Sequence, residues 1–264
     1  MNRNLQVLIE VATAGGFAVS ALLTSLRTLS GWAPVTSTPL SFERTLTGRM
    51  SLGGGAGELS LLGLVAQPTT AILWALLAAV LVAVVLHLAA RLRARRAAPQ
   101  PPAIALGLAM AALWPWVIGP APLPGLALAA GACTALTLGL AWQCDAVQGQ
   151  AEPIPGVEIP PAPGASALAF VAGWVVMAAT SALGLVLFDL GMGLERAILL
   201  GLLVAALAAA WVQLRLPRLV MFSVAAIWAM IGIAAATAGT SITIATACVL
   251  GISAVAVVVV RTTT

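Results

Sequence analysis

Long, uninterrupted apolar runs alternate with short polar or proline-rich stretches along this chain of 264 residues. A helix needs about 20 mostly apolar residues to cross a bilayer core, and backbone groups in lipid must be hydrogen-bonded within the protein. The runs show no period-two alternation, so they predict helices and not barrel strands. We expect an all-α fold: a polytopic transmembrane helix bundle of about eight spans, forming a single integral-membrane domain over residues 1–264.

The pattern also sets approximate bounds for each element. The spans are expected near residues 5–26, 67–88, 103–118, 125–143, 166–187, 195–214, 219–238 and 240–260. A polar stretch predicts an extramembrane loop or short surface helix over residues 27–62. The five prolines between residues 144 and 165 favour an extended, solvated linker.

Composition and charge agree with a membrane protein. The chain is 61% hydrophobic and 8% charged, whereas a soluble domain carries roughly 25% charged residues. In a membrane protein, an excess of arginine marks the cytoplasmic loops. The net positive charge therefore indicates how the chain is oriented in the membrane, and not a nucleic-acid partner. If the spans alternate, eight arginines lie on the side of the amino terminus and four on the other, and the densest cluster is Arg91, Arg93, Arg95 and Arg96. We therefore expect a multi-pass protein of the bacterial inner membrane, with both termini in the cytoplasm.

Few side chains offer chemistry. Glu10 lies about one turn into the first span and His87 near the cytoplasmic end of the second, so both are interpreted as interfacial polar residues. A single histidine excludes a haem held by two. Cys133, Cys144 and Cys248 form no CxxC pair and are interpreted as small apolar residues. No metal-ligand spacing and no GxSxG, P-loop or HExxH motif is present, so we expect no catalytic residue, no metal and no enzyme activity.

Tryptophans are the remaining candidates for a binding site. An aromatic belt at the membrane interface explains those near helix ends, such as Trp142 and Trp211. Trp74, Trp174 and Trp228 lie about a third to a half of the way along their spans. Flat aromatic faces inside a bundle suit a planar or polycyclic apolar ligand, and ordinary helix packing explains them equally well.

Three segments carry a family resemblance. Residues 172–182, AGWVVMAATSA, resemble the Gly-Trp-x-x-x-Ala-Thr-x-x-Asn pattern of tryptophan-rich sensory proteins, the bacterial relatives of the translocator protein. Residues 224–234, VAAIWAMIGIA, are similar to a Val-x-x-Trp-Ala-Leu-x-Gly-Ile-Ala run in the long, eight-helix members. Residues 68–74, PTTAILW, resemble the Thr-Pro-Ala-Gly-x-x-Phe-x-Ile-Trp start of another of their helices. The order of these segments resembles that of a divergent long member of the family.

The resemblance implies a five-helix core with added helices and a non-enzymatic protein in a regulatory or transport role. It implies that a tetrapyrrole or sterol-like ligand, or another apolar pigment, binds near Trp74, Trp174 and Trp228. The chain departs from the family in having no tyrosine and no asparagine beyond Asn2 and Asn4.

Two alternatives stay open. An accessory or structural subunit of a larger respiratory or photosynthetic complex, or a homo-oligomer, would pack its Ala, Gly and Leu surface against partner helices. A small-solute transporter is the other, although spans three to eight hold almost no charge for an ion pathway.

Overall fold

The structure, a computed structural model, describes residues 3–30, 50–51, 58–59, 68, 70–93, 100–150, 162 and 164–263. Within them the chain forms eight helices: α1 (Arg3–Ser30), α3 (Ala71–Arg93), α4 (Pro102–Val117), α5 (Pro122–Gln150), α6 (Ala165–Asp189), α7 (Leu194–Arg215), α8 (Val220–Thr237) and α9 (Ile242–Thr263). Two short strands, β1 (Met50–Ser51) and β2 (Glu58–Leu59), pair antiparallel between α1 and α3. The predicted all-helical membrane fold is confirmed.

Seven of the described helices are long and apolar enough to cross a membrane. The eighth, α4, is apolar but only 16 residues long and contains Pro115. Proline has no backbone N–H to donate, so Pro115 removes one helical hydrogen bond near the end of α4. This suits a short helix that turns directly into α5. Leucine and valine side chains are exposed along most of the helices, as lipid-facing surfaces require. The chain is a multi-pass membrane protein.

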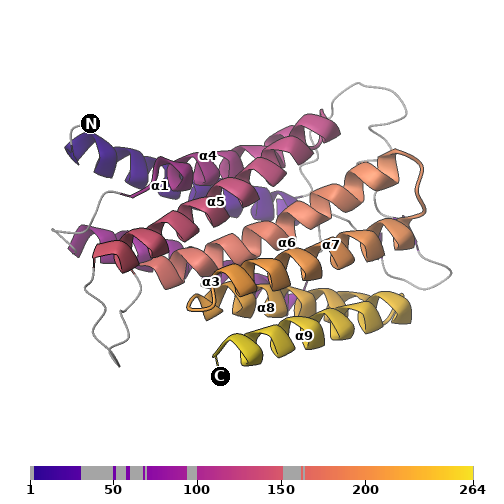
Figure 1. The fold of residues 1–264 in the computed structure, drawn as a ribbon. Helices are drawn as coiled ribbons and strands as arrows, with labels where there is room; N and C mark the ends of the chain where they lie inside the picture. The colour runs from indigo at the N-terminus through magenta and orange to yellow at the C-terminus, as the bar shows by residue number, and fades with distance from the viewer. Residues whose placement is uncertain are drawn as a thin grey trace.

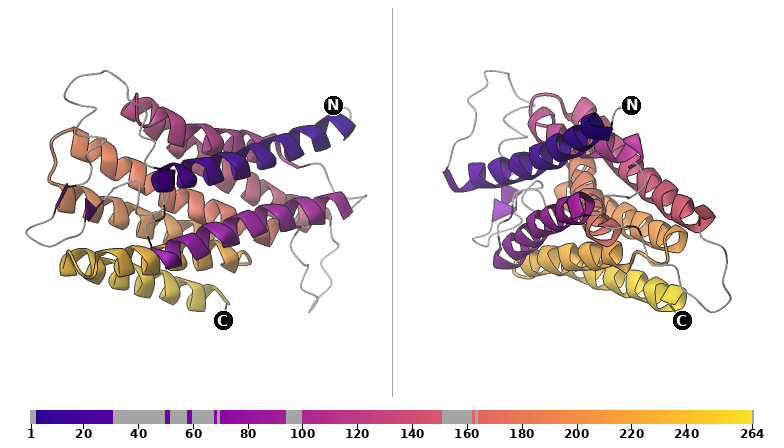
Figure 2. Two further views of the ribbon diagram at one scale, coloured as in Figure 1. Left: turned by 180° about the vertical axis from the view of Figure 1, so that it is seen from behind. Right: turned by 90° about the vertical axis from the view of Figure 1, so that its left-hand side faces the viewer.

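The helices run roughly along one common direction, and both ends of the chain lie at the same end of the bundle (Figure 1). Helix α6 lies at the centre and packs against α3, α5, α7 and α8. Seen from behind and end-on, α1, α4 and α5 form one side of the bundle, and α3, α8 and α9 form the other (Figure 2). Short turns connect α4 to α5, α6 to α7, α7 to α8 and α8 to α9, so neighbours along the chain are antiparallel.

The central position of α6 follows from its small residues. Almost every side chain from Ala165 to Val186 is buried. Gly173 brings the backbone of α6 against the carbonyl of Phe222 on α8, and Gly201 on α7 approaches the carbonyl of Thr180. Close backbone approach lets dispersion contacts hold helices together where lipid provides no hydrophobic drive.

Some predicted bounds are wrong at the polar ends. Helix α3 continues to Arg93, so part of the arginine cluster is helical, and α5 continues to Gln150, into the predicted linker. The expected loop over 27–62 begins later, because α1 extends to Ser30, and it includes the paired strands. The rest of that loop and most of the 144–165 linker beyond α5 lie outside the described residues.

Candidate functional site

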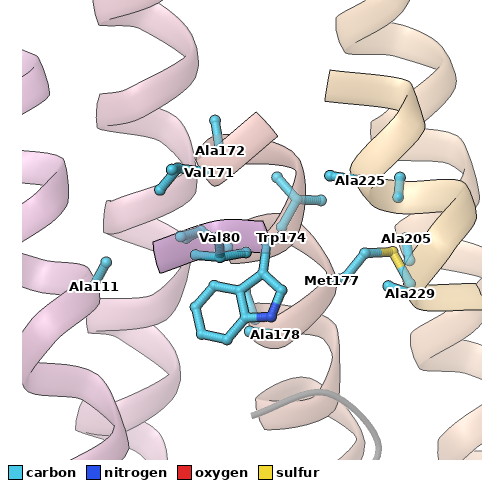
Figure 3. Close-up of a cluster of buried hydrophobic side chains, with 14 of the residues drawn as sticks. Val80, Ala111, Val171, Ala172, Trp174, Met177, Ala178, Ala205, Ala225 and Ala229 are labelled. Atoms are coloured by element: carbon cyan, nitrogen blue, oxygen red, sulfur yellow. The ribbon is translucent and has the colours of Figure 1, made fainter. Parts of the chain in front are cut away.

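Trp174 lies at the centre of the bundle. Its side chain is 3% exposed and packs edge-to-face against Phe17 of α1, with ring centroids 5.8 Å apart. Figure 3 draws Trp174 within a cluster of buried side chains that includes Val80 and Ala178, while Met177, one turn later, points toward Ala205 and Ala229. The ring of Trp174 on α6 therefore contacts α1.

Two buried indole groups have N–H donors that are not satisfied. The Nε1 atoms of Trp174 and Trp114 are both buried, and neither has a hydrogen-bond partner among the residues that the structure describes. Trp114 lies on α4, one turn after Ala111. A buried donor without an acceptor costs about 1–3 kcal/mol, so such groups in a folded core call for an explanation.

The other two predicted tryptophans have different surroundings. Trp228 on α8 is half-buried and meets Phe170 of α6 edge-to-face, with centroids 6.3 Å apart. Trp74 on α3 is also half-buried against the core. The helices that carry Trp74, Trp174 and Trp228 pack against one another. Whether the three form one ligand site stays a prediction.

A polar cluster closes one end of the bundle, and its first component is an ion pair. The Arg91 guanidinium donates to both carboxylate oxygens of Glu10, with Nη2 3.2 Å from Oε1 and Nε 3.4 Å from Oε2. The two side chains are 11% and 8% exposed. The interpretation of Glu10 as a residue that reaches the headgroups is wrong, since α3 covers it and neutralises its charge.

His87 is the second component of the cluster. Its Nδ1 lies 3.0 Å from the carbonyl oxygen of Gly164, and its Nε2 lies 3.1 Å from Nε2 of Gln100. A carbonyl can only accept, so Nδ1 carries the proton and Nε2 accepts from the amide. Gln6 of α1 donates to the backbone carbonyl of Gln100. His87 is therefore buried, not interfacial, and it joins the starts of α4 and α6 to the end of α3.

The sequence contained a signal for this cluster that the interpretation above missed. His87 and Arg91 are four residues apart and share one face of α3. Glu10 is the one carboxylate in the first span, and charges within spans usually pair with one another. Each of these side chains has a hydrogen-bond or ion-pair partner. We therefore interpret the cluster as structural, holding the ends of the helices together.

A pocket of about 340 Å³ opens at the same end of the bundle, between α5 and the turn from α7 to α8. Its walls combine apolar side chains with two arginines and one aspartate: Thr137, Leu138, Ala141, Cys144, Asp145, Trp211, Val212, Arg215, Leu216, Pro217, Arg218 and Leu219. The Arg215 guanidinium carbon lies 5.5 Å from the ring centre of Trp211. None of the three predicted tryptophans lines this pocket.

No group of three or more His, Cys, Asp or Glu side chains in the described ranges could hold a metal ion. The fold and these sites define a helical multi-pass membrane protein with an aromatic centre and a polar end. No protein-family model, no curated protein and no solved structure matches the chain.

Proposed function

We propose that this protein is a non-enzymatic membrane protein that binds an apolar, planar ligand of the tetrapyrrole or sterol type, in a regulatory or transport role. The buried, unpartnered Nε1 of Trp174 is the observation that carries the proposal. A ligand with a flat apolar body and a carbonyl, carboxylate or hydroxyl oxygen would stack against aromatic rings and accept from this donor. Trp114 on α4 carries a second buried indole N–H without an acceptor among the described residues.

The test is a titration of the purified protein with protoporphyrin, followed by quenching of tryptophan fluorescence. Trp174→Phe keeps a ring against Phe17 and removes the N–H, so it isolates the hydrogen bond. A hydrogen bond contributes about 1 kcal/mol, which corresponds to a roughly fivefold weaker affinity. Trp74→Leu and Trp228→Leu test the other two predicted faces, where loss of a ring contact should also weaken binding by about fivefold.

Trp142→Phe is the matched control, because Trp142 is 55% exposed on α5. It should bind protoporphyrin as the parent protein does. Absence of saturable quenching in the parent protein would contradict the proposal. Equal weakening by Trp142→Phe and Trp174→Phe would mean that the ligand does not use the central indole.

An accessory subunit of a larger membrane complex is the second candidate, and α9 favours it. Only 17% of its most apolar 18-residue stretch is buried within the bundle. Val249, Leu250 and Val257 are exposed along this helix. Purification in a mild detergent, followed by identification of bound proteins, separates the two candidates. Stoichiometric recovery with a respiratory or photosynthetic complex, together with no protoporphyrin binding, would favour the accessory role.

We also propose that the protein lies in a bacterial inner membrane with both termini in the cytoplasm. The end of the bundle that holds the polar cluster also carries Arg91, Arg93, Arg215, Arg218 and Arg261. Among the described residues, the opposite end carries Arg27, near the end of α1, and Arg196, at the start of α7. Arginine enrichment near span ends marks the cytoplasmic side.

A further inference from the structure

The pocket between α5 and the α7–α8 turn combines an apolar wall with a basic mouth. Leu138, Ala141 and Trp211 supply the apolar wall. Arg215 and Arg218, both exposed, lie at the mouth, together with one acid, Asp145. Among the described residues that line the pocket, two are basic and one is acidic.

The mouth is built on a fixed turn. Gln213 is fully buried below it, where Nε2 donates to the carbonyl of Pro217 and Oε1 accepts from Ser223 Oγ at 2.6 Å. The face of Trp211 lies under Arg215, which holds the guanidinium by a cation–π contact and leaves its N–H groups available to a ligand. The N-cap residue of α8, Leu219, also lines the pocket and provides no side-chain cap, so the positive end of the α8 dipole faces an uncapped turn.

An apolar track leads from the lipid-facing surface to this mouth. Exposed side chains recur at helical spacing along α7 and end at the pocket: Leu200, Leu203, Val204, Leu207 and Trp211. Residues at this spacing form one stripe along a helix. The stripe suits an acyl chain, and a guanidinium pair suits a phosphate, which arginine binds through two parallel hydrogen bonds.

We propose that this pocket binds an anionic phospholipid, with the phosphate between Arg215 and Arg218 and one acyl chain along the α7 stripe. The two arginines among the described lining residues favour an anionic over a zwitterionic headgroup. The position of the pocket at the arginine-rich end assigns the lipid to the leaflet on that side, where anionic lipids attract basic groups. This site is separate from Trp174 and does not depend on the proposed function.

Native mass spectrometry of the purified protein tests the proposal, with phosphatidylglycerol and phosphatidylcholine of the same chain length as probes. We expect tighter binding of phosphatidylglycerol, weakened by about fivefold in each of Arg215→Gln and Arg218→Gln. Asp145→Asn should strengthen it, because the change removes the opposing charge. Glycerol 3-phosphate, which has the phosphate but no acyl chain, should not compete at equal concentration.

Arg261→Gln is the matched control, since Arg261 is exposed at the same end of the bundle but does not line the pocket. Its lipid affinity should equal that of the parent protein. Equal affinity for the two lipids, or an equal loss in the Arg261 variant, would overturn the proposal. Effective competition by glycerol 3-phosphate would overturn the lipid as occupant and leave a phosphate site. All four variants change exposed side chains, and thermal unfolding checks that each remains folded.

Discussion

Arg91 and Glu10 are 81 positions apart in the sequence, yet they form a two-point ion pair between α3 and α1. Both side chains are largely buried, so water screens the pair only weakly. Removing one partner of a buried ion pair is far more costly than removing both.

Glu10→Gln should therefore lower the free energy of unfolding by about 3 kcal/mol. Arg91→Gln should have a similar effect, and the double variant should lose less than the sum of the two. Thermal unfolding of the four proteins in one mild detergent measures this coupling. Additive losses would mean that the pair contributes no interaction of its own.

Gly164→Ala should destabilise the polar end of the bundle. Gly164 has φ +78°, and an added Cβ would lie 2.9 Å from Nδ1 of His87 and 3.1 Å from its carbonyl oxygen. Left-handed backbone costs a residue with a Cβ about 1–2 kcal/mol, and displacement of His87 adds to it. Thermal unfolding should show a loss of about 2 kcal/mol or more.

Gly191→Ala separates the cost of the left-handed backbone from the cost of displacing His87. Gly191 also has a positive φ, +93°, but no atom lies within 4 Å of an added Cβ. The Gly191 variant should lose only the backbone contribution, about 1 kcal/mol. Equal losses at the two glycines would show that the contact between Gly164 and His87 adds nothing.

The helices could be predicted from the sequence because each needs only its own apolar run. The contacts between side chains of different helices could not be predicted in this way. The contact between His87 and Gly164 joins residues 77 positions apart and depends on α3 and α6 being neighbours. The ion pair depends in the same way on α1 lying beside α3. Hydropathy specifies which residues enter the membrane, whereas shape and side-chain pairing decide which helices meet.

The same holds for the candidate sites: the position of a residue along a span could be predicted from the sequence, but its contacts with other helices could not. Trp174 could be selected from its place along a span, but its edge-to-face contact with Phe17 depends on α1 lying against α6, and its unsatisfied Nε1 depends on burial within the bundle. Trp211, near the end of α7, is exposed, and its position in an aromatic belt stays a prediction. Its role as the wall of a basic pocket depends on Leu138 and Arg218, which come from other segments.

Gly173→Ala should disrupt the packing of α6 on α8. An added Cβ would clash with the carbonyl oxygen of Phe222 and lie 3.0 Å from Cβ of Ala225. Overpacking of this kind costs about 1–3 kcal/mol. Gly16→Ala on α1 is the control, because no atom lies within 4 Å of its added Cβ, and it should keep or gain stability. Unchanged unfolding of the Gly173 variant would contradict the tight helix contact.

Replacement of Cys133 and Cys248 by alanine should leave folding and protoporphyrin binding close to those of the parent protein. Cys248 is fully buried, and Sγ of Cys133 lies 3.7 Å from the carbonyl of Val175. Loss of each sulfur removes packing worth about 1 kcal/mol. Binding lost from a variant that still unfolds cooperatively would assign the thiols a chemical role.

The orientation of the bundle can be tested at two exposed turns on either side of α7. Gly193 precedes the helix and Pro217 follows it, so a spanning α7 places them on opposite faces of the membrane. With the arginine-rich end in the cytoplasm, Gly193→Cys should react with an impermeant thiol reagent in cells whose outer membrane is permeabilised, and Pro217→Cys should not. The three native cysteines are changed to alanine beforehand, and both positions should react once the inner membrane is opened. The reverse pattern would invert the orientation, and reaction at both positions in intact inner membranes would mean that α7 does not span.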